Sequence, residues 1–435
     1  YIGSGTASVD LASVSSTSKN FSASATNFDA FSSTSVTATG SVVFESKGDT
    51  FATSVINATG NFSTTGLTIA SGSSSIRIGK PGNTKNVTLV SALSAGQISV
   101  YAGDLSVGGS LTATNASGSG ILAKAAGNIV VDAGTSTAAK KSISATGTGS
   151  TAPITLWSNS DASGTGAINV NSYVDILTVN GDITLAGSAT AGEASPTGFA
   201  MGNGDNGSGV ELAAGAVATD SVKVVSSGSG NILIKGQVNN QTSYDGVTIW
   251  SGVKVSSGTG TIGIFGVSQE PTIAAAAPAV NINRTGGYTT TISTGSNATT
   301  AIEISGIVNS ATASASTAAG GVFVKANSGT VNISATGSGD ISITGKASSG
   351  TTNAVELNYT NVTAAGGDIT VDGDTKAIQL GYSGGTVTTV FGGSTADSKS
   401  GHITFYSDNL SVQGSGSATF QNATGLYLLS KSDSF

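Results

Sequence analysis

A short cassette recurs along most of this chain: a glycine, an isoleucine two positions later, and a second apolar residue two positions after that. Alternating apolar and polar residues are typical of a strand with one buried side, and glycine favours the turn before it. Each copy therefore predicts a turn and a short β-strand with two inward-pointing side chains. The copies begin at Gly96, Gly127, Gly166, Gly181, Gly230, Gly260, Gly339, Gly367 and Gly401.

The spacing of the cassettes predicts how the strands assemble. Four intervals lie between 28 and 34 residues and the others are 15, 39, 49 and 79, which fits a unit of roughly 30 residues with insertions. Residues 230–255 and 339–363 can be aligned, and each contains three short apolar segments separated by polar turns. Three strands per unit predict one triangular rung of a single-stranded parallel β-helix, or β-solenoid.

A single rung cannot bury its apolar side, so the rungs must stack on one another. With roughly 30 residues per rung, the chain would form about 14 rungs and a rod on the order of 70 Å long. We therefore predict an all-β fold in which residues 1–435 form one continuous array. Residues 1–69 are less regular and richer in phenylalanine, which suggests the same coil with larger interior side chains. Residues 273–280 fit a helical turn and an irregular loop equally well.

Composition bears on whether the chain is ordered at all. Charged residues make up 9% of the chain, against roughly 25% in an average soluble protein, and 62 residues are glycine. A flexible linker rich in Gly, Ser and Thr is therefore the competing interpretation. The 38% of hydrophobic residues, placed at alternate positions, favours ordered β structure. The chain has no cysteine, which excludes disulfides, thiolate metal sites and thiol nucleophiles.

Charge and hydropathy exclude two classes of partner. The 17 lysines and arginines are scattered through a chain of net charge −7, so no basic surface for nucleic acid is expected. The longest apolar stretch, residues 273–280, is far shorter than the roughly 20 residues of a membrane-spanning helix. The chain starts at Tyr1 without a signal-peptide pattern, so we expect a processed product or a piece of a longer chain.

Residues 122–131 and 154–168, together with cassettes such as Gly-Asp-Ile-Thr-Leu at Gly181, resemble the repeats of filamentous-haemagglutinin-type exoproteins of Gram-negative bacteria. The resemblance covers most of residues 90–430. It implies a right-handed parallel β-helix, export across both membranes through a dedicated outer-membrane transporter, and a role in adhesion, aggregation or biofilm formation. The amino-terminal secretion domain of that family is not recognisable in residues 1–69.

Asp368, Asp372 and Asp374 are the closest cluster of carboxylates, and a carbohydrate-processing β-helix enzyme would need such a cluster on one strand face. Asp-Gly is ordinary turn chemistry, so a solvated turn is the favoured interpretation. The same carboxylates, or the isolated segment 202–207, are also the candidates for bound calcium. Neither matches an EF-hand loop or the repeated nonapeptide of a calcium-binding roll.

The other residues with chemical potential are best explained as structural. His402 is the only histidine, so no pair of imidazoles can hold a metal ion. Trp157 and Trp250 follow similar sequences; an exposed indole could stack on a sugar, but covering a corner of the rung is the favoured role. Asn-x-Ser/Thr triplets arise by chance in a chain so rich in Ser and Thr. They occur, for example, at Asn57, Asn86, Asn332 and Asn358.

We predict no catalytic, cofactor-binding or metal-binding residue. The expected function is a non-enzymatic structural or adhesive fibre outside a bacterial cell, with cell-surface glycans or proteins, or copies of itself, as partners. One alternative is a self-assembling sheath or surface-layer subunit, since the ends of a β-helix are open sheet edges. The other alternative is a carbohydrate-processing enzyme.

Overall fold

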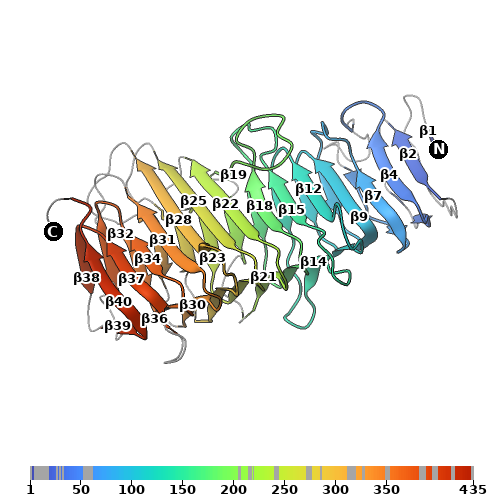
Figure 1. Cartoon of the computed structure of the whole chain (residues 1–435). Helices are drawn as coiled ribbons and strands as arrows, with labels where there is room; N and C mark the ends of the chain where they lie inside the picture. The colour runs from blue at the N-terminus through green and yellow to red at the C-terminus, as the bar shows by residue number, and fades with distance from the viewer. Residues whose placement is uncertain are drawn as a thin grey trace.

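The computed structural model describes residues 2–3, 19–25, 28, 31, 34–51, 62–203, 207–213, 218, 220–239, 244–270, 277–284, 287–310, 320–325, 329–347, 353–381, 388–393, 400–412 and 417–432. This part of the chain contains many strands and no helix, which confirms the all-β prediction. Figure 1 shows the strands side by side along an elongated body, with the two termini at opposite ends. The paired strands form three ladders, each made of parallel neighbours.

The first ladder runs from one end of the body to the other. Its strands are β2 (Phe21–Ala25), β4 (Ser41–Ser46), β7 (Ser73–Ile78), β9 (Leu93–Ala102), β12 (Ile121–Ala125), β15 (Ile154–Ser158), β18 (Ile183–Gly187), β22 (Ile232–Asn239), β25 (Ile262–Glu270), β28 (Thr300–Ser310), β31 (Asp340–Lys346), β34 (Ile369–Asp372), β37 (Ser400–Tyr406) and β40 (Ala423–Leu429). β1 (Ile2–Gly3) pairs with β2, and β19 (Ala200–Gly202) pairs with the second half of β22.

The second ladder is a sheet of its own. It contains β5 (Phe62–Ser63), β8 (Val87–Leu89), β10 (Leu105–Val107), β13 (Ile129–Val131), β16 (Ile168–Val170), β20 (Val210–Leu212), β23 (Val247–Trp250), β26 (Val280–Arg284), β29 (Val322–Lys325), β32 (Asn353–Asn358), β35 (Ala377–Leu380) and β38 (Asn409–Val412).

The third ladder begins with the first residues of β9. It continues through β11 (Leu111–Ala113), β14 (Lys141–Ala145), β17 (Val174–Thr178), β21 (Val222–Ser226), β24 (Val253–Ser257), β27 (Thr290–Thr294), β30 (Val331–Ala335), β33 (Thr360–Ala364), β36 (Thr388–Gly392) and β39 (Ser417–Gln421). β3 (Thr34–Val36) and β6 (Leu67–Ile69) form a separate parallel pair.

The chain visits the three ladders in turn and then returns to the first, which is the path of a β-solenoid. One such circuit is β22, β23 and β24, followed by β25. A second is β31, β32 and β33, followed by β34. The first three strands of each circuit begin within residues 230–255 and 339–363, the two segments whose alignment predicted three strands per unit.

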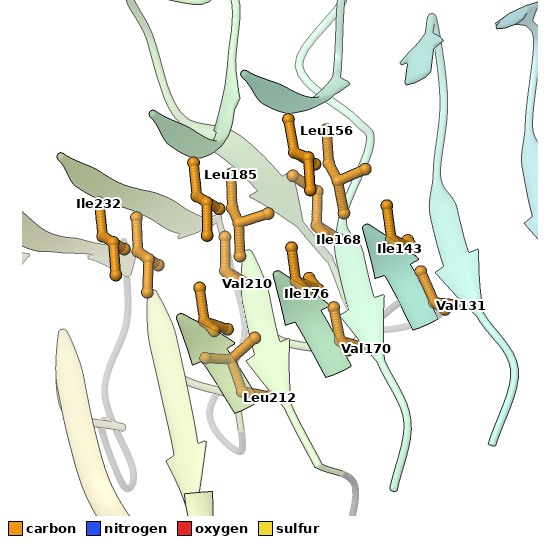
Figure 2. Close-up of a cluster of buried hydrophobic side chains, with 14 of the residues drawn as sticks. Val131, Ile143, Leu156, Ile168, Val170, Ile176, Leu185, Val210, Leu212 and Ile232 are labelled. Atoms are coloured by element: carbon orange, nitrogen blue, oxygen red, sulfur yellow. The ribbon is translucent and has the colours of Figure 1, made fainter. Parts of the chain in front are cut away.

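Aliphatic side chains fill the interior as columns that cross from coil to coil. Inward residues alternate with outward ones along most strands, as in β22, and before the last coil the inward ones are buried. Figure 2 shows part of this interior, with Ile143 and Ile176 of the third ladder beside Ile168 of the second. The longest column belongs to the first ladder, where residues in register are all isoleucine. Its members are Ile76, Ile98, Ile121, Ile154, Ile183, Ile232, Ile262, Ile302, Ile341, Ile369 and Ile403.

The isoleucine column corrects the assumption that every cassette marks the same position of the coil. Ile129 and Ile168, from the cassettes at Gly127 and Gly166, lie in the second ladder rather than the first. The 15-residue interval before Gly181 thus covers only part of a circuit, from β16 in the second ladder through β17 in the third to β18 in the first. Conversely, the 79-residue interval after Gly260 hides a member of the column, Ile302, because Thr300 stands where the other copies have glycine.

A second column contains only glycine and sets the corner where the first ladder passes closest to the second. Gly236, Gly266, Gly306 and Gly345 are partners in register. A Cβ on any of them would overlap a backbone carbonyl oxygen, for example that of Gly321 in the case of Gly306. A side chain at this corner would therefore push the two ladders apart.

Phenylalanines fill the interior near the amino-terminal end. Six of them are buried, and their ring centroids lie 5.4–6.4 Å apart. They are Phe21, Phe28, Phe31, Phe44, Phe51 and Phe62. The segment for which a helical turn was considered is partly outside the described residues, which resume at Ala277; Val280 begins β26.

Candidate binding cleft

Two loops leave the first ladder and enclose a cleft on the outside of the coil. One follows β15 and the other follows β18, and Figure 1 shows loops rising from the body near β18 and β19. Backbone hydrogen bonds fix their ends, because Gly187 pairs with Gly198 and Gly166 pairs with Met201. The cleft measures about 360 Å³. Its lining residues are Asn159, Ala162, Gly164, Ser188, Ala189, Thr197, Gly198, Phe199, Met201 and Gln237.

A single carboxylate organises the second loop. Glu193 accepts hydrogen bonds from the backbone nitrogens of Ala189, Thr190 and Thr197, at 3.0–3.3 Å. The hydroxyl of Thr197 donates to it at 2.7 Å and that of Thr190 at 3.2 Å. These hydrogen bonds, that of the Thr197 hydroxyl above all, lower the pKa of Glu193 from 4.5 to about 2. The loop is therefore fixed by a group that stays ionised at any ordinary pH.

Side chains of the first ladder anchor the second loop, which follows β18, to the coil. The indole nitrogen of Trp157 donates to the Ser188 hydroxyl at 2.8 Å, and the Lys124 ammonium lies 3.6 Å from the indole centroid. Lys235 donates to the carbonyl oxygen of Thr197 and lies 4.8 Å from the centroid of the Phe199 ring. Burial lowers the pKa of both lysines, and the charge of Glu193 opposes that shift.

Trp157 is 3% exposed and covers the junction between ladder and loop, so it cannot offer its face to a sugar. Trp250 lies in the second ladder, where its indole nitrogen donates to Glu211 at 2.6 Å. The similar sequences around the two tryptophans thus do not place them at equivalent positions of the coil.

The second position of a cassette links one coil to the next. The side-chain oxygen of Asp340 accepts from the backbone nitrogen of Asp368 at 2.8 Å, and Asp368 accepts in the same way from His402 at 2.7 Å. Asp182 accepts likewise from Asn231 at 2.7 Å. Asp368 is therefore engaged in holding successive turns in register.

A second carboxylate of the predicted cluster, Asp372, is engaged elsewhere. Asp372 accepts from the backbone nitrogen of Asp374 at 2.8 Å and pairs with the Lys431 ammonium at 2.9 Å. That hydrogen bond raises the pKa of Lys431. Among the residues that the structure describes, no three His, Asp or Glu side chains are grouped so that they could hold a metal ion.

His402 is half-exposed, and its ring centroid lies 5.2 Å from that of Tyr427. Of the asparagines in Asn-x-Ser/Thr triplets, Asn358 is fully buried and donates to Glu356 at 2.7 Å, so no sugar can be attached there in the folded chain. Asn86 and Asn332 accept hydrogen bonds from neighbouring coils. Asn57 and residues 204–206 of the possible calcium loop lie outside the described part of the chain.

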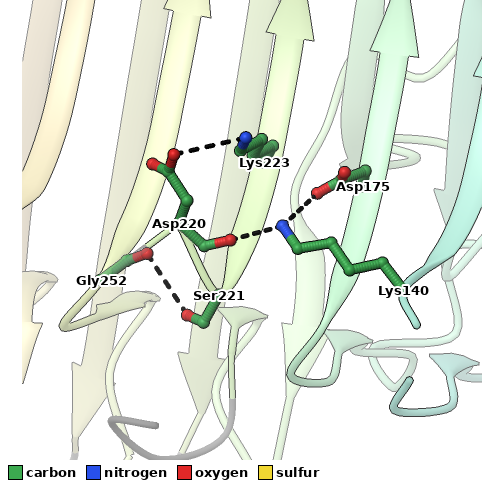
Figure 3. A network of polar contacts seen from close by, with 6 residues as sticks. All are labelled: Lys140, Asp175, Asp220, Ser221, Lys223 and Gly252. Carbon is green, nitrogen blue, oxygen red and sulfur yellow. Dashed lines mark hydrogen bonds and ion pairs between the residues drawn. The ribbon is translucent and has the colours of Figure 1, made fainter. Parts of the chain in front are cut away.

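An ion-pair network ties the third ladder together. The Lys140 ammonium donates to a carboxylate oxygen of Asp175 at 2.7 Å and to the backbone carbonyl of Asp220 at 2.5 Å. Lys223 pairs with the side chain of Asp220 at 3.3 Å, and Figure 3 shows how these groups converge from different coils. The Lys140 and Asp175 side chains are 14% and 19% exposed, so this contact is largely shielded from water.

A larger hollow of about 490 Å³ lies at the carboxy-terminal end, against Phe405, Leu410, Leu428 and the turn at Ser407. It is part of the last coil, where residues that continue the interior columns are exposed. Leu426 is the register partner of Ile403, yet it is 44% exposed, and Leu428 beside Phe405 is 49% exposed. This hollow lies against the exposed apolar side chains of that coil.

Sequence reasoning did not find the cleft residues Asn159, Phe199 and Gln237. One signal pointed to the region: the longest interval of the isoleucine column is the 49 residues between Ile183 and Ile232, and it contains the second loop.

No helix in the described residues has the length and apolar character needed to cross a membrane. No family model, curated protein or solved structure matches this chain.

Proposed function

We propose that this chain is a segment of a non-enzymatic structural and adhesive fibre, displayed outside a bacterial cell. The observation that carries the proposal is the continuous pairing of the first ladder from β2 to β40. A stack of this kind is a stiff spacer that presents side chains and loops far from its base. Its partners are surface glycans or proteins of host or neighbouring cells.

The proposal includes a finer architecture, that of a right-handed triangular coil with about 14 rungs of roughly 30 residues. The three ladders that the chain visits in turn support it. The handedness, the export route and the kinship with filamentous-haemagglutinin-type exoproteins rest on the resemblance of the repeats.

The contacts of the aspartates support a non-enzymatic role. Asp368 bonds the next coil, and Asp372 is paired with Lys431. General acid–base catalysis on a sugar needs two carboxyl groups that converge on the scissile bond. Release of reducing ends from any member of a panel of polysaccharides would contradict this part of the proposal.

Self-assembly is the second candidate, favoured by the apolar surface of the last coil. Large apolar side chains there are 36–50% exposed, and a contiguous exposed apolar surface can associate with another copy. They are Val412, Phe420, Leu426, Tyr427, Leu428 and Leu429. Sedimentation at increasing concentration tests it, since a monomer throughout would contradict assembly.

Beads coated with the folded chain test adhesion. We expect them to bind bacterial or epithelial cells, whereas beads coated with heat-denatured chain do not. Equal binding by both kinds of bead, or by neither, would overturn the adhesive function.

A further inference from the structure

We propose that the cleft between the loops after β15 and β18 binds one neutral sugar residue. The inference rests on the proposed adhesive function and names the ligand class of one site on the fibre. Four properties of the cleft support it: its size, the uncharged lining, the mixture of apolar and hydrogen-bonding groups, and the rigidity of the loops.

The size of the cleft fits a single monosaccharide. Its volume of about 360 Å³ is near the lower end of the range for small-molecule sites. A cleft of this size admits one small ring with its substituents rather than an extended oligomer. A hexopyranose is a ligand of that size, whereas a folded protein surface could not enter.

The lining indicates a neutral ligand. None of the described side chains that line the cleft carries a charge. The nearby charged groups already have partners within the protein, because Glu193 accepts hydrogen bonds from its own loop and Lys235 donates to the carbonyl oxygen of Thr197. An ionised ligand would lose its hydration here without gaining an opposite charge, which is costly.

The lining also combines surfaces that suit the two sides of a sugar ring. Phe199 and Met201 are apolar and can cover the C–H groups of a pyranose, while amides lie beside them to meet the hydroxyls. Asn159 is 3% exposed, and its oxygen accepts from the backbone nitrogen of Gly164 at 3.0 Å, which leaves an NH₂ group able to donate. Gln237 donates to Asn239 at 2.8 Å and keeps its carbonyl oxygen as an acceptor.

The cleft is organised before any ligand arrives. The five hydrogen bonds to Glu193, the Trp157 contact with Ser188 and the Gly187–Gly198 pairing fix the loop that carries Phe199. Binding therefore orders few additional groups, which lowers its entropic cost. A ligand this small still has few contacts, so we expect a dissociation constant in the millimolar range.

Saturation-transfer-difference NMR on the full chain tests the site, with the methyl glycosides of glucose, galactose, mannose and N-acetylglucosamine as probes. We expect transfer to at least one glycoside. Gln237→Ala, which leaves the loop anchors untouched, should weaken that binding about two- to tenfold through the loss of one hydrogen bond. Phe199→Ala should abolish it.

The matched control is Phe265→Ala. Phe265 is a partly buried phenylalanine on the outside of β25, in register with Lys235 but outside the cleft. Binding should be unchanged in this variant. The thermal midpoint of every variant shows whether the coil is intact, and a Phe199→Ala chain that has lost its fold is replaced by Gln237→Ala as the deciding variant.

Two outcomes overturn the proposal: no transfer to any of the four glycosides, or equal transfer in wild type and Gln237→Ala. The adhesion assay separates this failure from failure of the proposed function. Attachment of coated beads without glycoside binding refutes the cleft alone, while glycoside binding without attachment refutes the adhesive role alone.

Discussion

Replacing Ile341 by alanine tests whether the isoleucine column holds the coils together. Ile341 is fully buried in β31, in register with Ile302 of β28 and Ile369 of β34. Backbone hydrogen bonds keep the coils at a fixed spacing, for instance from the Ile341 nitrogen to the Asp368 oxygen at 2.9 Å, so the cavity cannot collapse. The cost of removing a buried isoleucine side chain beyond Cβ is about 2–5 kcal/mol.

Amide hydrogen exchange followed by mass spectrometry measures this cost locally. At about 1.4 kcal/mol per factor of ten, the opening equilibrium of β28, β31 and β34 should rise by roughly thirty-fold to several thousand-fold. In a stack with nearest-neighbour coupling, β12 and β15 should keep their protection. The adjacent, outward-facing Ser342 supplies the control, because Ser342→Ala should change exchange by less than about threefold. An Ile341→Ala effect equally small, or one spread evenly over the chain, would refute the reasoning.

Three further predictions concern other contacts. Gly306→Val should lower stability by at least about 1–3 kcal/mol by forcing a side chain against the Gly321 carbonyl, whereas Gly48→Ala, in open space, should leave the thermal midpoint unchanged. Glu193→Gln should speed amide exchange in its loop at neutral pH. Because the pKa of Glu193 in the folded chain, about 2, lies below the ordinary 4.5, its carboxylate stabilises the loop fully above pH 4.5 and stops doing so as pH falls through 2. The exchange rates of wild type and Glu193→Gln should therefore converge near pH 2, and a difference in rate that stays constant with pH would contradict the prediction. Lys140→Met should cost about 1–3 kcal/mol in denaturant unfolding, and a double-mutant cycle with Asp175→Asn should show coupling.

The β-solenoid could be predicted because the inside of the coil repeats. An isoleucine, an outward polar residue and a second aliphatic residue are what stacked strands require, and β22 and β31 lie where the cassettes predicted. The assignment of strands to ladders could not be predicted, since inward positions of all three ladders demand the same residue types. Ile129 and Ile98 look alike in sequence and lie in different ladders.

The cleft could not be predicted because its contacts join loops of different coils. In the sequence Glu193 is an isolated acid among small residues, and its hydrogen-bond partners are evident only in the folded loop. Asn159 and Gln237 are 78 positions apart in the chain, and each is an unremarkable amide in its own context. No periodic signal marks such residues, because nothing repeats them.

The irregular intervals of the isoleucine column carry a practical meaning for engineering. Only 23 positions separate Ile98 from Ile121, yet 49 separate Ile183 from Ile232. Both pairs are nevertheless direct register partners on adjacent parallel strands. The scaffold thus tolerates extra sequence at its corners at little cost in loop-closure entropy. The corner between β9 and β10 is only Gly103 and Asp104, and both residues hydrogen-bond the coils on either side. A foreign peptide is therefore better grafted into a corner that already carries an insertion, such as the one after β18.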